Sequence, residues 1–178
     1  MNLLPLVPDT PAFDRAVDCY WGVFGRSPHG RPDRATAETM FRRHAQFPGY
    51  RGLVAATGGS VASPGTVLGY AYGYESRPGQ YYRGELAAAL PDARADRWLA
   101  DCFEFVELGV VAHARRQGVG GALHDALLAD RPQSTSVLTT GVDNGGARAL
   151  YADRGWVTLH EPFSVQDGPE MVVLGLDL

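Results

Sequence analysis

The chain has 178 residues, a length that suits one domain with a substantial core, and we expect a single domain over residues 1–178. Its content of 45% hydrophobic and 20% charged residues is that of an ordinary globular protein. The net charge of −4 argues against a general nucleic-acid-binding protein, because such proteins are normally basic.

The N-terminal segment and the cysteines indicate the compartment. The first nine residues are apolar, but they have no basic start and Pro5 interrupts them, so we expect no signal peptide. No apolar run approaches the ~20 residues that a membrane-spanning helix needs. Cys19 and Cys102 lie far apart and form no CxxC pair. The sequence therefore predicts a cytoplasmic protein with two reduced thiols and no membrane partner.

Residue usage points to the source genome rather than to mechanism. All sixteen basic residues are arginine, isoleucine is absent, and asparagine occurs only at Asn2 and Asn144. This bias is typical of a GC-rich genome and fits a bacterial source. The absence of lysine is therefore not interpreted as a functional feature.

The first predicted elements are a strand and two helices. Residues 3–7 read as a strand, and Thr10 and Pro11 then predict a helix start with Thr as N-cap and Pro at the first helical position. A polar loop at 25–33 ends this helix. The apolar spacing over about 34–47 predicts a second helix.

A β-hairpin follows, because 50–57 and 66–75 are β-rich runs separated by the turn sequence GGSVASPG. Tyr70, Tyr72 and Tyr74 recur with period two and therefore point to one face of the sheet. Two interpretations remain open for these tyrosines. They form a packed sheet face, or one or more of their hydroxyls lies at a site that binds an acceptor substrate.

Residues 80–99 read as a helical insertion that contains a proline. Its aromatic residues Tyr81, Tyr82 and Trp98 suit a substrate pocket or a core. Trp98 is the preferred pocket candidate, because it stands just before the next strand.

The central strand spans residues 102–111 and carries two carboxylates, Glu104 and Glu107, among apolar neighbours. Their odd separation places them on opposite faces of a regular strand, although a β-bulge would change this. A buried acid is costly unless it is paired or its pKa rises. Each glutamate is therefore either a candidate general base or one half of a structural ion pair with arginine.

A glycine-rich turn follows this strand and has the form R-x-x-G-x-G over residues 115–120. It is not a P-loop, because no lysine follows the second glycine, and it lacks the three spaced glycines of the dinucleotide fingerprint. A strand, a glycine turn and a helix start nevertheless form an anion site, because backbone N–H groups converge there and the helix dipole is positive. The helix is predicted over 118–129, and a strand over 134–140 follows it.

A second motif spans residues 144–156 and reads N-x-x-A-x-x-L-Y-x-x-x-G-[aromatic]. Asn144 is suited to cap a helix that ends at Gly155. A strand is predicted over about 156–159, a loop over 160–167 and a closing strand within 168–178.

Together, the two motifs resemble those of the GNAT superfamily of acyl-CoA-dependent N-acetyltransferases. The resemblance implies an α/β fold, namely a twisted mixed sheet of six to seven strands with helices on both faces. It also implies acetyl-CoA as co-substrate and direct attack of an amine in a ternary complex. In this family the last strands often form a dimer contact, so a homodimer is also considered.

The resemblance also assigns roles to residues. The amides of Gln117, Gly118, Val119, Gly120 and Gly121 would hold the CoA pyrophosphate with support from Arg115 and Arg116, and the strand end at Val110 and Val111 would pair with the pantetheine arm. Asn144 and Tyr151 would complete the cofactor site. Tyr151 would also protonate the leaving thiolate, and Glu107, or as second choice Glu104, would deprotonate the amine directly or through water.

The acceptor is less well defined. Mild acidity and the aromatic insertion favour a small cationic amine, and a protein or peptide amine is the alternative. A non-catalytic acyl-CoA sensor or scaffold is a further alternative. No metal is expected, because His29, His44, His113, His124 and His160 lack metal-ligand spacing.

Overall fold

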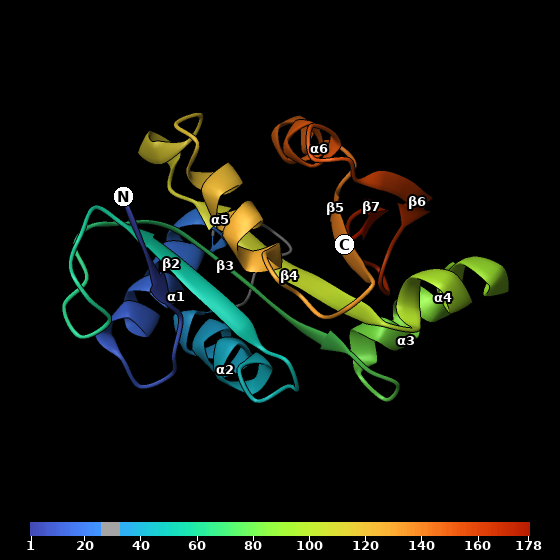
Figure 1. Cartoon of the computed structure of the whole chain (residues 1–178), viewed down its shortest axis with the longest axis horizontal. Coiled ribbons are helices and arrows are strands. Elements are labelled where there is room, and N and C mark those ends of the chain that lie inside the picture. The colour runs from blue at the N-terminus through green and yellow to red at the C-terminus, as the bar shows by residue number, and fades with distance from the viewer. Residues whose placement is uncertain (26–32) are drawn as a thin grey trace. The chain divides into compact units, whose positions relative to one another are not determined.

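The computed structural model describes residues 1–25 and 33–178 and shows an α/β protein (Figure 1). The strands are β1 (Asn2–Pro5), β2 (Arg51–Ala56), β3 (Val67–Ser76), β4 (Cys102–Val110), β5 (Thr135–Gly141), β6 (Val157–Phe163) and β7 (Met171–Asp177). The α-helices are α1 (Pro11–Phe24), α2 (Arg34–His44), α3 (Tyr81–Ala89), α4 (Asp92–Leu99), α5 (Val119–Leu128) and α6 (Gly145–Ala152), with a short 3-10 helix at Ala112–Ala114.

The seven strands form a mixed sheet in the order β1-β2-β3-β4-β5-β7-β6. The pairs β1/β2, β2/β3, β5/β7 and β6/β7 are antiparallel, whereas β4 and β5 are parallel. The expected α/β class and mixed sheet are thereby confirmed. The predicted loop at 25–33 lies mostly outside the described residues.

Three boundaries differ from the sequence predictions. Helix α2 ends at His44 rather than near residue 47, because Pro48 and the left-handed Gly49 follow. The predicted insertion at 80–99 is two helices, since Pro91 cannot continue the backbone ladder of α3. Strand β6 continues to Phe163, where the sequence predicted a loop from residue 160. The pairing of β6 with β7 is irregular, so buried and exposed residues do not alternate regularly along this extension, and the sequence pattern did not indicate it.

The chain forms two compact units. The first comprises residues 1–74 and 106–129. In its core, Phe41 of α2 packs edge-on against Tyr72 of β3, with ring centroids 4.9 Å apart. Three residues before Tyr72 on β3, a Cβ on Gly69 would meet Leu123 of α5 at 3.2 Å. Helices α2 and α5 therefore cover opposite faces of this strand.

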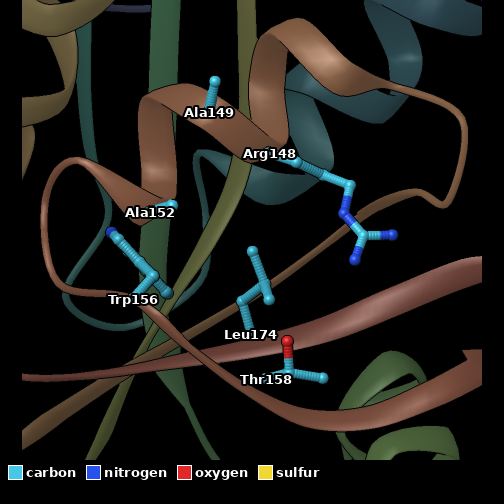
Figure 2. A pocket seen from close by; sticks show the side chains of 6 residues that line it. All are labelled: Arg148, Ala149, Ala152, Trp156, Thr158 and Leu174. Atoms are coloured by element: carbon cyan, nitrogen blue, oxygen red, sulfur yellow. The ribbon is translucent and has the colours of Figure 1, made fainter.

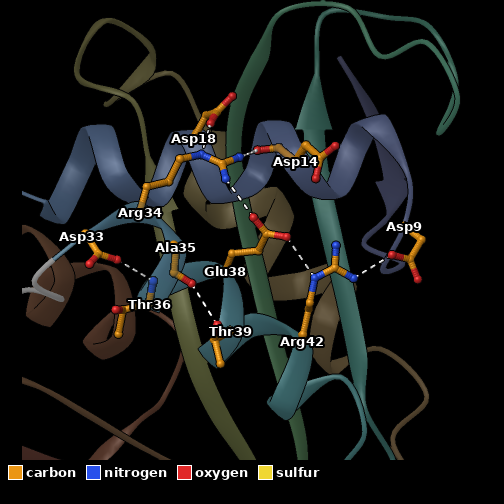
Figure 3. Close-up of polar contacts among 10 residues, drawn as sticks. All are labelled: Asp9, Asp14, Asp18, Asp33, Arg34, Ala35, Thr36, Glu38, Thr39 and Arg42. Carbon is orange, nitrogen blue, oxygen red and sulfur yellow. Dashed lines mark hydrogen bonds and ion pairs between the residues drawn. The ribbon is translucent and has the colours of Figure 1, made fainter.

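An ion-pair network links α1 and α2 in the first unit (Figure 3). Glu38 of α2 accepts hydrogen bonds from Arg34 and Arg42, each at 2.9 Å. Arg34 also contacts Asp18 of α1 at 2.6 Å, and Arg42 contacts Asp9 at 2.7 Å. The network fixes α2 against α1 and the turn that precedes it.

The second unit comprises residues 75–105 and 130–178. Its core lies between the α3–α4 insertion and strands β5, β6 and β7. Trp98 of α4 packs so closely on β7 that a Cβ on Gly175 would come within 2.7 Å of its ring. Val173, two residues before Gly175 on β7, belongs to the same core, whereas Leu174 between them faces α6. Helices therefore cover both faces of this part of the sheet as well.

Candidate functional site

The turn before α5 has the backbone geometry that an anion site needs. Gly118 is left-handed, with φ of 83°, and forms the N-cap of α5, where no side chain caps the helix. Arg116 is also left-handed, with φ of 60°. Open space surrounds the position of a Cβ on Gly118, and residues 115–118 are exposed. A ligand can therefore approach this turn from solvent.

The predicted pyrophosphate donors lie at this helix start. The first N–H groups of a helix have no partner within it, and the helix dipole makes them attractive to anions. The amides of Gly118, Val119, Gly120 and Gly121 occupy these positions. The Gln117 side chain closes the turn by donating to the His113 carbonyl at 2.8 Å. These residues fit a diphosphate group by the chemistry of their donors.

The end of β4 distinguishes the two valines that were predicted to pair with the cofactor. The Val111 N–H donates to the Leu68 carbonyl of β3 at 3.0 Å. Successive N–H groups of a strand point to opposite edges, so the N–H of Val110 points away from β3. The Val110 carbonyl accepts a hydrogen bond from Arg115 Nε at 3.1 Å. Of the two valine amides that were predicted to pair with the pantetheine arm, only that of Val110 therefore points away from β3. Arg115, which was predicted to support the pyrophosphate, also makes a structural contact with the end of β4.

Glu107 belongs to a cluster with the β3 tyrosines. It is half-buried on β4, two residues before Gly109, and the Tyr70 ring lies against Gly109. Burial, and then the charge of Glu107, raise the pKa of both Tyr70 and Tyr72 well above the ordinary value of a phenol. Both phenols therefore stay protonated near a carboxylate that was predicted as the base.

The three tyrosines form a packed face, which was one of the two interpretations of the sequence. Tyr70, Tyr72 and Tyr74 are all buried. Phe41 packs on the first two and Phe47 on the third, with centroid separations of 4.8–5.4 Å. Packing explains why the rings are buried, but it does not give every hydroxyl a hydrogen-bond partner.

Glu104 belongs to a different cluster, in the second unit. It is 3% exposed, and its carboxylate accepts a hydrogen bond from the Ser76 hydroxyl at 3.3 Å. Arg83 of α3 donates to Ser76 Oγ at 3.4 Å and also to the Leu99 carbonyl. Ser76 thus lies between Glu104 and Arg83. The structural ion pair with arginine that was weighed for these glutamates stays a prediction.

The second motif forms the helix that it predicted. The Asn144 side chain accepts a hydrogen bond from the Ala147 N–H at 3.2 Å and caps α6. Tyr151 lies in the last turn of this helix and is 6% exposed. Its ring packs edge-on against Trp156 at 5.6 Å and Phe105 at 6.2 Å. Aromatic packing thus fixes the ring of the candidate acid.

A pocket that the sequence did not indicate lies beside α6 in the second unit (Figure 2). It has a volume of about 310 Å³. Arg148 at its rim forms a two-pronged ion pair with Glu161, at 2.8 and 3.2 Å. The lining residues are Arg148, Ala149, Ala152, Trp156, Thr158 and Leu174. Its walls come from separate elements, which is why no local sequence pattern could reveal it.

Of the insertion's three aromatic residues, Trp98 and Tyr82 belong to a core, which was one of the two interpretations, whereas Tyr81 is exposed. Trp98 belongs to the apolar core of the second unit. The Tyr82 hydroxyl is 2.6 Å from Thr139 Oγ1, and its ring packs on Phe163. Tyr81 is 52% exposed and accepts a hydrogen bond from Gln166 at 3.3 Å.

Residues 1–25 and 33–178 show neither a metal-binding cluster nor a helix that could span a membrane. No group of three histidine, cysteine, aspartate or glutamate side chains in residues 1–25 and 33–178 is arranged to hold a metal ion, and His29 lies outside that range. Within the same range, the helices lack the combination of length and apolarity needed to cross a bilayer.

Comparisons with known proteins agree with the fold. No model of a known protein family matches the chain. A GCN5-like protein acetyltransferase of Mycobacterium tuberculosis is 34% identical over 121 residues, which are 63% of this chain and 59% of the relative. The matched part of the chain thus spans about three fifths of that relative's length.

Two solved structures share the architecture. The ribosomal-protein-S18-alanine N-acetyltransferase of Escherichia coli aligns with a TM-score of 0.64 and 18% identity over 99% of this chain and 92% of that one. A GNAT family acetyltransferase of Elizabethkingia anophelis, solved with acetyl-CoA bound, aligns with a TM-score of 0.59 and 14% identity over 99% and 97% of the two chains. The fold implied by the sequence motifs is confirmed.

Proposed function

We propose that this chain, which shares the fold of GNAT acetyltransferases, belongs to the GNAT superfamily and transfers an acetyl group from acetyl-CoA to an amine. The observation that carries the proposal is the left-handed, exposed turn at Gly118, which opens α5 with uncapped N–H groups. Such a turn suits the diphosphate of CoA. Arg115 and Arg116 add positive charge beside it.

The proposed reaction assigns one task to each side chain. Glu107 removes a proton from the acceptor ammonium, which exposes the nitrogen lone pair. The amine then attacks the thioester carbonyl carbon, and the Val110 N–H stabilises the developing oxyanion. The C–S bond breaks, and Tyr151 donates its proton to the departing sulfur. The nitrogen then loses its second proton, which restores the Tyr151 phenol and leaves the neutral amide. No acyl-enzyme is formed.

A variant of Tyr151 tests this proposal. Tyr151→Phe keeps the ring that packs on Trp156 and Phe105 but removes the proton donor. We expect kcat to fall by about 100-fold, measured as thiol release from acetyl-CoA. The affinity for acetyl-CoA, measured by thermal shift, should not change.

A matched control is Tyr81→Phe, which removes an exposed phenol of α3 and should leave thiol release unchanged. If acetyl-CoA raises the Tm of the wild type but no amine is ever acetylated, the chain is a sensor rather than an enzyme. If acetyl-CoA does not raise the Tm at all, the chain lacks the cofactor site.

The acceptor needs a panel of amines. The sequence favoured a small cationic amine, whereas the Mycobacterium relative is described as a protein acetyltransferase and the Escherichia coli enzyme acts on a ribosomal protein. The placement of Trp98 in the core removes one of the arguments for a small-molecule pocket. The panel therefore contains polyamines, aminoglycosides, amino-acid derivatives and peptides. Turnover of peptides alone would refute the small-amine preference.

A further inference from the structure

One hydroxyl in the first unit is buried without a partner. Tyr70 is fully buried, and its Oη has no hydrogen-bond partner among the residues that the structure describes. Tyr72, two residues along the same strand, is equally buried, but its hydroxyl lies 3.1 Å from His44 Nδ1. Buried polar groups are nearly always satisfied, so an orphaned hydroxyl calls for an explanation.

The surroundings of Tyr70 hold its ring in place. Phe41 and Tyr20 pack on it, with ring centroids at 5.4 and 6.4 Å. A Cβ on Gly109 of β4 would come within 2.6 Å of the ring and 3.0 Å of Oη. The hydroxyl cannot turn out to solvent, and it reaches the β4 backbone only because residue 109 has no side chain.

The same part of β4 carries the candidate base. Glu107 precedes Gly109 by two residues, so its side chain lies on the face of β4 against which the Tyr70 ring packs at Gly109. Burial, and then the charge of Glu107, raise the pKa of Tyr70. The Tyr70 hydroxyl therefore keeps its proton and remains a hydrogen-bond donor close to a carboxylate.

We propose that the Tyr70 hydroxyl holds a water molecule that also contacts the Glu107 carboxylate, and that Glu107 deprotonates the acceptor amine through this water. The inference rests on the proposed acetyl transfer. Tyr70 is then a positioning residue rather than a catalytic one. A single water satisfies the orphaned hydroxyl and has enough polar partners to be ordered.

The proton balance of this step is simple. The water accepts a hydrogen bond from Tyr70 and donates one to the Glu107 carboxylate. When the ammonium N–H bond breaks, its proton passes to the water, and a water proton passes to a Glu107 oxygen. The products are a neutral amine, a protonated Glu107 and an unchanged water, and Tyr70 keeps its proton throughout.

A double-mutant cycle of Tyr70→Phe and Glu107→Gln tests the proposal. Tyr70→Phe should lower kcat by about tenfold, and the KM for acetyl-CoA should stay within about twofold of the wild type. In the Glu107→Gln background the same substitution should change kcat by less than about twofold, because the path it serves is already lost.

Stability gives an independent readout. Tyr70→Phe should change the Tm little, because its hydroxyl has no protein partner and the water that it holds keeps its contact with Glu107. Tyr72→Phe is the matched control on the same strand and should lower the Tm, since it breaks the contact with His44. Tyr50→Phe, which breaks a 3.3 Å hydrogen bond to the Leu6 carbonyl, should lower the Tm without lowering kcat.

The outcomes separate this inference from the proposed function. Suppose that the wild type acetylates an amine and that Tyr70→Phe has the same kcat. The water-positioning role is then overturned, while acetyl transfer stands. The same holds if Tyr70→Phe lowers kcat by the same factor in the Glu107→Gln background as in the wild type. A marked loss of Tm in Tyr70→Phe would also overturn it. If the wild type acetylates nothing, both proposals fail together.

Discussion

At the scale of single residues, the two valines at the end of β4 show how one position along a strand decides a role. Their side chains are alike, but only the Val111 N–H donates to the Leu68 carbonyl. The Val110 N–H points to the opposite edge, where the Arg115 side chain reaches the Val110 carbonyl. We therefore propose that Val110, rather than Val111, offers the donor to an incoming thioester.

Amide hydrogen exchange checks this assignment. Without ligand, we expect the Val111 amide to be protected and the Val110 amide to exchange faster. Saturating acetyl-CoA should slow exchange at Val110 and change Val111 little, so that Val111 serves as the internal control. Unchanged exchange at Val110 in the complex would exclude it as the oxyanion donor.

At the scale of elements, α2 depends on charges that link it to α1 and to the turn before it. The hydrogen bond from Arg42, followed by that from Arg34, lowers the pKa of Glu38 below its ordinary value of 4.5. A carboxyl whose pKa is lower in the folded state stabilises the fold while it is ionised. This contribution is complete above pH 4.5 and is lost as the pH falls through the lowered folded value.

The variant Glu38→Gln tests that linkage by thermal unfolding across pH. At pH 7 it should unfold roughly 1–3 °C below the wild type, because exposed ion pairs contribute modestly. The difference should shrink as the pH falls below 4.5, because Glu38 of the wild type is then protonated and loses the charge that the variant lacks. Asp96→Asn, which removes an exposed carboxylate of α4, is the control and should show no comparable pH-dependent difference. A difference that persists in acid would show that packing, not charge, is responsible.

At the scale of the whole molecule, each compact unit contains one buried cysteine. Burial raises the pKa of Cys19 to about 12 in the first unit. Burial, and then the charge of Glu104, raise the pKa of Cys102 to about 12 in the second. Since the thiolate is the reactive form, both thiols are unreactive at neutral pH while their units stay folded.

A thiol reagent applied at pH 8 should therefore label both cysteines at least about 100-fold more slowly than a free thiol. In guanidinium chloride, two equivalents should react rapidly, which serves as the control. The site of labelling, read by mass spectrometry, reports the opening of each unit separately. Rapid labelling of Cys19 or Cys102 in the native protein would show that its unit opens under native conditions.

Much of the fold could be predicted because its signals act over a few residues. Thr10 accepts a hydrogen bond from the Phe13 N–H, and Asn144 accepts one from the Ala147 N–H, so each cap is complete within its own helix start. The turn at Gly118 likewise depends on glycine's tolerance of a positive φ. These short-range preferences fixed where the helices begin and carried the family resemblance.

What the sequence determined by itself is therefore the order of the elements, their caps and the two motifs. Only the tertiary structure decided the partners of each side chain. Tyr70 and Tyr72 have the same local pattern, but α2 brings His44 to one hydroxyl and nothing in the described chain to the other. Trp98 became core because β7 presents Gly175 to it from far along the chain. Caps and turns arise from contacts between near neighbours in sequence, whereas burial and pairing depend on segments that meet only after folding.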